Sequence, residues 1–365
     1  MRILYTSYLG FSNLGDDLCL EEFASIANNR GGVEVMPLVP DRAGTDQRRF
    51  IVENVAGADA VVVGGGSLLT YDFYLTVAVE AGKQGKPVYF WGSGIDGASE
   101  NTAMSIANGD RLEDASIGAV NVELLKTAVD NATGIFVRGP VTRDILTLIH
   151  PSFIRARIAG DPGFLVEPER SADHPIFHAG RPVLMVNWGV IDNEGAGYGG
   201  GDGLVQAERF FEALRRLAGE YALLLFPMIP RDNQLHERWA QELSAQGAQV
   251  EVDETVGPAS RVAGLMSKSV AVIGRKLHAQ VLAATAGAPF VGLAYRAKCF
   301  DFAASTDSMD YTLSTGDPDL AGRVVELTAR AVARREEIVE RLSAFRRIYR
   351  ARLMDAAGQI FSGVS

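Results

Sequence analysis

The sequence has few cysteines, no basic excess and no long apolar run, and each shortage excludes a class of protein. Its 365 residues include two cysteines, Cys19 and Cys299, which suit a reducing compartment and have no metal-ligand spacing. No segment approaches the roughly 18 consecutive apolar residues of a membrane span. The first ten residues lack the apolar core of a signal peptide and are typical of a first strand. We therefore expect a cytoplasmic protein with no membrane span.

The charge balance argues against a nucleic-acid partner. The chain has 45 acidic and 35 basic residues, a formal net charge of −10, whereas nucleic-acid-binding domains usually have a basic excess. Its composition, 47% hydrophobic and 22% charged, is that of an ordinary globular protein with ample core. The length corresponds to roughly two domains.

Short apolar runs alternate with helix-like segments along both halves of the chain. Runs such as 60–65 and 270–274 are continuously apolar, which is typical of strands buried on both faces. Helical spacing in 16–29 and 122–132 places helices between strands, and this alternation indicates parallel sheets. The sequence therefore predicts an α/β protein with two Rossmann-like, doubly wound domains facing a cleft. The predicted strands are 2–6, 33–39, 60–65, 87–94, 134–139, 182–189, 221–228, 248–253, 270–274 and 289–295.

The domain boundaries are predicted from a change in pattern. Segment 167–181 is polar, contains two prolines and has no periodicity, so we interpret it as a linker. We predict an N-terminal domain over 1–170 and a C-terminal domain over 178–340. The last residues predict long helices, and the stretch of about 345–365 is expected to rejoin the first domain. The glycine-rich segment 193–203 predicts a loop that acts as a lid.

Ligands of open α/β sheets bind beyond the carboxyl ends of the strands, so the residues there are candidates. In the first half, the strand ends carry glycines whose backbone amides can approach a ligand. They also carry the acid Asp16, in the first turn of a helix, and Arg138. The acid also has a purely structural interpretation, because it favours the helix dipole. The glycines match neither GxGxxG nor a Walker loop, so a dinucleotide is not indicated. The candidates are Asn13, Gly15, Asp16, Gly64, Gly65, Gly66, Ser67, Gly94 and Arg138.

In the second half, two strand ends carry a concentration of positive charge. Arg275 and Lys276 follow one apolar run, and Arg296 and Lys298 follow the next. Residues 255–300 contain six basic residues and no acid, which in an acidic chain predicts an anion site. A histidine beside such a patch is a candidate proton donor, because histidine changes charge near neutral pH. That histidine is His278.

Seven motifs, taken in order, resemble the polysaccharide pyruvyl transferase family. Each motif alone is unspecific, but the ordered set spans nearly the whole chain. The motifs are NLGDD (13–17), VVVGGGSLL (61–69), WGSGIDG (91–97), IFVRGPVTRDIL (135–146), AGDPGFLV (159–166), FPMIPRDNQ (226–234) and KLHAQVLAATAGAPFVGLAYRAK (276–298).

The resemblance implies a GT-B-like fold and transfer of a pyruvyl group from phosphoenolpyruvate to a sugar, with a cyclic ketal as product. It assigns the acceptor side to the N-terminal domain and the donor side to the C-terminal domain. It implies that His278 is the general acid and that Asp16 acts on the acceptor hydroxyl. Arg138 and Lys298 are the implied donor-binding residues, together with Arg275 or Lys276. Phosphoenolpyruvate is then a co-substrate, and we expect neither a cofactor nor a metal.

Three positions depart from the family pattern. The family usually has arginine two residues before the histidine, where this chain has Lys276, and only arginine holds a carboxylate or phosphate bidentately. Gly-Ser-Gly at 92–94 replaces Gly-Gln-Gly, and Val-Asn-Trp-Gly at 186–189 stands where many relatives have an arginine. The acceptor stays open between a sugar, a glycan and a lipid-linked glycan, the last placing the enzyme at the inner membrane face. Homo-oligomerisation is also left open.

Three other functions stay open on the sequence. A GT-B glycosyltransferase would use a nucleotide sugar and hold its ribose with Asp253 or Glu254. A family member could act on a small metabolite that is not a glycan. A two-lobed anion-binding protein without enzymatic activity is the third.

Overall fold

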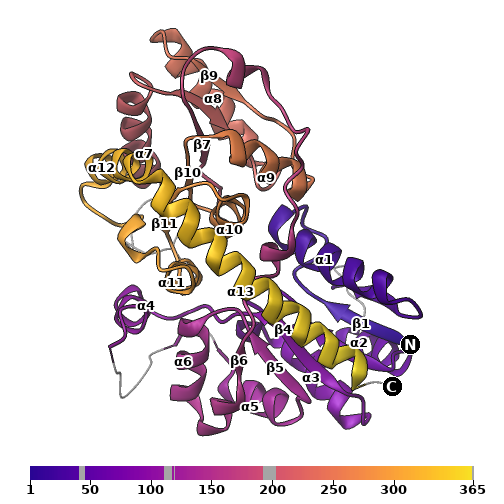
Figure 1. Cartoon of the computed structure of the whole chain (residues 1–365). Coiled ribbons are helices and arrows are strands. Elements are labelled where there is room, and N and C mark those ends of the chain that lie inside the picture. The colour runs from indigo at the N-terminus through magenta and orange to yellow at the C-terminus, as the bar shows by residue number, and fades with distance from the viewer. Residues whose placement is uncertain (41–45, 111–116, 119, 192–202, 364–365) are drawn as a thin grey trace. The chain divides into compact units, whose positions relative to one another are not determined.

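The computed structural model describes residues 1–40, 46–110, 117–118, 120–191 and 203–363. The chain forms two compact units, Met1–Leu165 with Arg347–Ser365, and Val166–Arg346. Each unit is built on one six-stranded parallel sheet with flanking helices (Figure 1). The glycine-rich segment interpreted as a lid lies outside the described residues, except for Gly203.

The sheet of the first unit has the strand order β2-β1-β3-β4-β5-β6. Its order reverses between β1 and β3, where Thr6 is paired with Val63, so the crevice beyond these two strands is the expected ligand site. The elements are β1 Arg2–Thr6, α1 Leu14–Arg30, β2 Glu34–Leu38, α2 Gln47–Ala56, β3 Ala60–Val63, η1 Leu68–Thr70, α3 Asp72–Lys83, β4 Val88–Ser93, α4 Glu100–Ala107, α5 Val122–Asp130, β5 Gly134–Val137, α6 Pro140–Ile149, η2 Pro151–Arg155, β6 Arg157–Ile158 and η3 Pro162–Leu165.

The sheet of the second unit has the order β12-β11-β10-β7-β8-β9. It reverses between β7 and β10, where Asn187 is paired with Gly274. Counted from β7, this is the strand order of the dinucleotide-binding Rossmann fold. The elements are η4 Pro175–His178, β7 Val183–Asn187, α7 Gly203–Leu217, β8 Ala222–Leu225, α8 Asp232–Ala245, β9 Val250–Val252, α9 Ala259–Lys268, β10 Ala271–Gly274, α10 Leu277–Ala286, β11 Phe290–Ala294, α11 Ala297–Ser305, η6 Met309–Tyr311, β12 Thr312–Ser314, α12 Leu320–Ala333 and α13 Arg335–Ser362.

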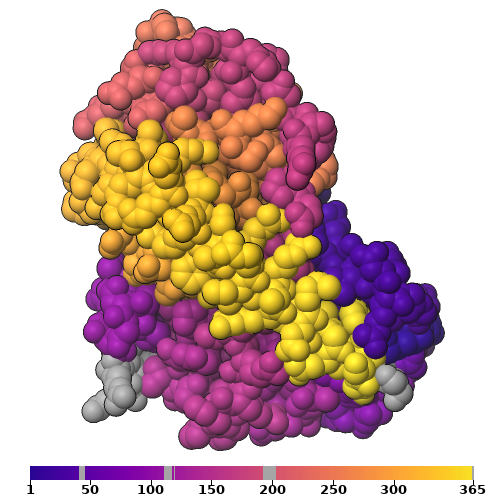
Figure 2. Space-filling view, in the orientation of Figure 1, coloured from indigo at the N-terminus to yellow at the C-terminus, as the bar shows by residue number. Residues whose placement is uncertain are grey.

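Helix α13 begins in the second unit and ends in the first. In the first unit, the indole N–H of Trp91 donates to the carbonyl of Leu353, 3.3 Å away. The ring of Phe361 lies 5.5 Å from that of Phe23 on α1. In Figure 2 the yellow C-terminal residues accordingly lie against the indigo residues of the first unit. The end of the chain therefore completes the core of the unit in which the chain begins.

The polar segment 167–181 packs on the second unit. The backbone N–H of Glu169 donates to the carbonyl of Ser260 at 2.9 Å. A Cβ added to Gly264 would lie 2.2 Å from the carbonyl oxygen of Glu169, so the two backbones are in close contact. Ile176 is fully buried. Specific packing of this kind, in addition to the peptide connection, fixes the segment on α9.

Each strand predicted from the sequence occurs, and the prediction of two doubly wound α/β domains is confirmed. The prediction omitted the edge strands β6 and β12, because two or three residues are too short to form an apolar run. Among the described residues, no helix is long and apolar enough to cross a bilayer.

Candidate functional site

In the first unit, Asp16 lies in the first turn of α1, beside the loop that follows β3. The side chain of Asn13 caps α1 by accepting a hydrogen bond from the Gly15 N–H at 3.2 Å, and its amide donates to Asp16 Oδ2 at 2.5 Å. Asp16 is 7% exposed. The hydroxyl of Ser7 in the loop after β1 donates to the Gly65 carbonyl at 3.3 Å. The cap and the two loops therefore fix the carboxylate in one place.

The glycines after β3 are required by close packing. A Cβ on Gly64 would lie 1.9 Å from the phenol oxygen of Tyr5, and one on Gly65 would lie 2.4 Å from the sulfur of Cys19. Gly66 follows, where a Cβ would lie 3.2 Å from Asp16 Oδ1. Ser67 is half-buried and precedes η1. Without side chains, this loop can run directly over the first turn of α1.

Arg138 is the first residue after β5 and is 1% exposed. A Cβ on Gly94 would lie 2.4 Å from its Nη2, so the guanidinium lies directly against that glycine. Ser93, the central residue of the unusual Gly-Ser-Gly, donates its hydroxyl to the carbonyls of Val63 at 2.9 Å and Gly64 at 2.6 Å. The serine thus ties the end of β4 to the loop after β3, and the glycine leaves room for the arginine.

The sequence analysis did not propose Cys19 or Asp161, and the Cys19 thiol interacts electrostatically with Asp161, Asp16 and Arg138. Burial raises the pKa of the Cys19 thiol well above its usual value. The charges of Asp161 and Asp16 raise it further, whereas the charge of Arg138 lowers it. All of these groups are therefore close enough to interact electrostatically. The thiol is kept protonated, so Cys19 is a packing residue and not a nucleophile.

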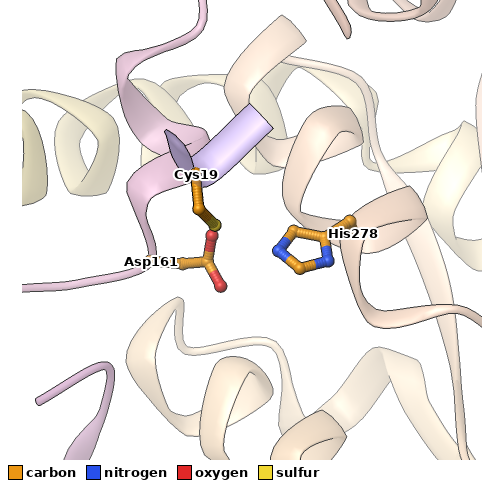
Figure 3. A group of neighbouring side chains, drawn as sticks. All are labelled: Cys19, Asp161 and His278. Atoms are coloured by element: carbon orange, nitrogen blue, oxygen red, sulfur yellow. The ribbon is translucent and has the colours of Figure 1, made fainter. Parts of the chain in front are cut away.

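Asp161 comes from the loop after β6. Its Oδ1 accepts from the Gly163 N–H at 2.9 Å, and a carboxylate oxygen lies within 4.8 Å of the Cys19 sulfur. Figure 3 shows these two side chains together; the third labelled residue, His278, belongs to the second unit. The sequence signal for Asp161 was its position in the motif Ala-Gly-Asp-Pro-Gly. No apolar run precedes this motif, so Asp161 was not recognised as a residue at the end of a strand.

In the second unit, Asn187 joins the carboxyl ends of three strands. Its amide donates to the carbonyl of Phe226 at 3.0 Å, and its Oδ1 accepts from the Lys276 N–H at 3.2 Å. Its backbone carbonyl accepts from the Arg275 N–H at 3.0 Å. Asn187 lies in Val-Asn-Trp-Gly, one of the three positions at which this chain departs from the family pattern. Its hydrogen bonds fix the backbone of Arg275 and Lys276.

Arg275 points into the protein. It is 5% exposed, its guanidinium carbon lies 4.3 Å from the ring centre of Trp188, and its Nη1 donates to the Gly189 carbonyl at 3.2 Å. The ring of Tyr295 lies 5.7 Å away. This cation is held by aromatic rings and a carbonyl, an arrangement that positions the loop after β7.

The Lys276 side chain lies along the loop after β7. A Cβ on Gly189 would lie 2.2 Å from its Cγ, so the lysine stem lies along that glycine. Burial lowers the pKa of Lys276 to about 8, although the charge of Asp232 opposes the shift. The charges of Lys298, Arg231 and Arg275 lower it further. These four cations therefore lie close together, and Arg231 is a member that the sequence analysis did not propose.

Asp232 is a second acid that the sequence analysis missed. It is fully buried, its Oδ1 accepts from the Val190 N–H at 2.8 Å, and its Oδ2 accepts from the N–H groups of Met228 and Ile229 at 2.9 and 3.2 Å. It therefore connects the loops after β7 and β8 and offsets part of the positive charge. One turn later in α8, burial lowers the pKa of His236 to about 4, so this histidine is neutral.

His278 lies in the first turn of α10, two residues after the helix cap Lys276, and is 8% exposed. The N-terminus of a helix offers unpaired backbone N–H groups and a positive dipole end, which together favour an anion. Lys298 is close enough to act electrostatically on Lys276, and its Nζ lies 5.1 Å from the ring centre of Tyr295. The second unit thus brings together Arg275, Lys276, His278 and Lys298, and the first unit holds the other candidate residues.

Comparisons with known proteins agree with the motifs. The sequence profile of the family described as polysaccharide pyruvyl transferase matches residues 13–296, which confirms the resemblance. Among curated proteins, none matches the chain in sequence.

Solved structures with a similar fold include three enzymes at low sequence identity. The α,α-trehalose-phosphate synthase (UDP-forming) from Burkholderia vietnamiensis is 11% identical, with 99% of this chain and 98% of that chain covered and a TM-score of 0.59. The UDP-GlcNAc 2-epimerase of Neisseria meningitidis is 11% identical, with 94% of each chain covered and a TM-score of 0.56. That of Methanocaldococcus jannaschii is 10% identical, with 91% and 92% covered and a TM-score of 0.57. At these identities the likeness shows the fold alone, and it confirms the GT-B-like class.

Proposed function

Because the chain belongs to the polysaccharide pyruvyl transferase family, we propose that it transfers the pyruvyl group of phosphoenolpyruvate to a sugar or glycan, forming a pyruvate ketal. The observation that carries the proposal is the group of cations at the start of α10, with His278 in the same helical turn. Phosphoenolpyruvate is a small, multiply charged anion, and such a cluster neutralises both its phosphate and its carboxylate.

In this proposal, Lys276, Lys298 and the N-terminal amides of α10 hold the donor anion. Arg275 fixes the loop after β7. Although it is buried, it also adds positive charge to the site. Arg138 keeps the donor-binding role that the family resemblance assigns to it. Preorganised cations of this kind stabilise the charge that develops on the departing phosphate.

The chemistry begins with protonation of the donor. His278 gives a proton to the methylene carbon, and the central carbon becomes electrophilic. A sugar hydroxyl forms a bond to that carbon and gives its proton to the carboxylate of Asp16. The carbon–oxygen bond to phosphate then breaks, the electron pair leaves with phosphate, and a second hydroxyl closes the ketal and releases its proton to phosphate. The scheme needs no metal and no cofactor.

The glycosyltransferase alternative has weaker support in the described residues. Asp253 was one candidate to hold the ribose of a nucleotide sugar. Its Oδ2 lies 2.6 Å from Arg261 Nη1, and its Oδ1 accepts from the Thr255 N–H at 3.3 Å. Both carboxylate oxygens are therefore engaged by the protein itself, which leaves Glu254 for that role.

Isothermal titration tests the proposed donor. Phosphoenolpyruvate, UDP and GDP are each titrated into the protein, and phosphoenolpyruvate is expected to bind while the two nucleotides do not. Phosphate release on adding sugar acceptors then tests the transfer. Binding of a nucleotide without binding of phosphoenolpyruvate would assign the cations to a diphosphate and support the glycosyltransferase instead.

The affinity for phosphoenolpyruvate should fall as the pH rises through about 8, because Lys276 loses its charge there. Below that pH the lysine is protonated and attracts the anion. A bound anion favours the protonated form, so the loss occurs at or above this value. Arginine at this position stays charged to a much higher pH, and Lys276→Arg should therefore bind the donor almost equally well from pH 7 to 9. Dissociation constants measured across this range for both proteins check the prediction. Parallel curves for the two proteins would remove Lys276 from the donor site.

A further inference from the structure

Three aromatic side chains meet where the loops after β1 and β3 of the first unit approach each other. The rings of Tyr8 and Phe11, both in the loop after β1, are stacked with centroids 4.0 Å apart and planes 10° apart. The ring of Tyr71, from the segment after β3, lies 6.4 Å from that of Tyr8 and is tilted by 33°. We call Tyr8, Phe11 and Tyr71 the aromatic platform. The two loops that supply it are those at the reversal of strand order.

The platform is accessible, although large apolar side chains normally become buried. Phe11 is 37% exposed and Tyr71 is 42% exposed, whereas Tyr74, which packs edge-on against Tyr71 with centroids 6.4 Å apart, is buried. Tyr74 therefore supports Tyr71 from within. Exposed aromatic rings over a buried base are typical of a surface that binds a flat or ring-shaped ligand.

The carboxylate of Asp16 lies against the segment that supplies Tyr71. Burial raises the pKa of Tyr74, and the charge of Asp16 raises it further, as do Tyr8 and Tyr71. Asp16 therefore lies within electrostatic range of Tyr74, which packs against Tyr71. A Cβ added to Gly66, five residues before Tyr71, would lie 3.2 Å from Asp16 Oδ1, so the carboxylate contacts the segment that supplies Tyr71. An anion at this position accepts hydrogen bonds from hydroxyls and repels phosphates, so a neutral polyol fits the surface better than a nucleotide diphosphate does.

We propose that the aromatic platform binds the C–H face of one pyranose ring of the acceptor, with a hydroxyl of that ring directed to Asp16. This inference rests on the proposed function, because Asp16 is there the group that takes the hydroxyl proton. A pyranose presents C–H groups on one face and hydroxyls around its edge. The negative face of an aromatic ring attracts the C–H groups, and the carboxylate binds a hydroxyl.

Saturation-transfer NMR with the methyl glycosides of glucose, galactose, mannose and N-acetylglucosamine tests the platform. At least one glycoside should receive saturation on its ring C–H protons. Each platform ring contributes about 3- to 10-fold to affinity, so Phe11→Ala with Tyr71→Ala should weaken binding about tenfold or more. Tyr71→Phe keeps the ring and should bind normally. Ile154→Ala removes another exposed apolar side chain of the same unit, which is 78% exposed, and should also change nothing.

The outcomes separate this inference from the proposed function. If none of the four glycosides binds, or if binding survives the double variant with an unchanged melting temperature, the platform does not bind sugar. UDP binding that the double variant abolishes would assign the platform to a nucleotide base and overturn the inference. Titration of phosphoenolpyruvate is independent: its failure alone would refute the donor and leave sugar binding at the platform standing. In the transfer reaction, the double variant should raise the acceptor KM and leave the phosphoenolpyruvate KM unchanged.

Discussion

Replacing His278 with alanine is expected to lower turnover by about 10²- to 10⁴-fold, the usual contribution of a general acid. The side chain lies in the first turn of α10, two residues after Lys276. We expect a donor bound by these cations to place its methylene carbon within reach of the imidazole. The cations proposed to hold the anion remain in this variant. Binding of phosphoenolpyruvate should therefore persist while phosphate release almost stops.

The control for this variant separates proton transfer from packing. His278→Gln keeps a polar side chain of similar size but cannot donate a proton in the same way, so its turnover should fall as far as that of the alanine variant. Near wild-type turnover in either variant, with the fold intact, would show that another group protonates the donor.

Replacing Arg138 with alanine is expected to weaken phosphoenolpyruvate binding by about 30-fold to several thousand-fold, the range for loss of one partner of a desolvated charge pair. The guanidinium is almost fully buried against Gly94, so its position is fixed before any ligand binds. Isothermal titration of phosphoenolpyruvate into the variant measures the loss.

Arg138 also has a structural role that the experiment must separate. The charge of Arg138 acts on the buried thiol of Cys19, as do the charges of Asp16 and Asp161. Removing the arginine therefore leaves these two carboxylates without a compensating positive charge. Arg138→Lys keeps the charge and loses the bidentate fork, and it should fold normally but bind the donor weakly. If the lysine variant binds phosphoenolpyruvate as tightly as the wild type and the alanine variant only melts earlier, the arginine stabilises the first unit and does not bind the donor.

The sequence was sufficient for the fold because parallel strands buried on both faces leave a local signal. Runs such as 60–65 and 270–274 are apolar without interruption, and the helices between them keep helical spacing. The same logic selected Asp16, Arg138 and Lys276 as candidate site residues, since each follows a recognisable strand or begins a helix. Strand β6 left no such signal, and therefore Asp161, which follows it, was not proposed.

The sequence by itself determined the class of fold, the family and the strand ends at which charged residues gather. Only the tertiary structure decided which of those residues face inward and which neighbours they have. Arg275 and Lys276 are adjacent in the chain, yet their side chains have different neighbours. The guanidinium of Arg275 is held against Trp188, whereas the side chain of Lys276 lies along Gly189. Tyr8, Phe11 and Tyr71 meet because β1 and β3 are neighbours in the sheet. The physical reason is that burial and charge interactions depend on distances in space, and strand order creates those distances between residues far apart in the sequence.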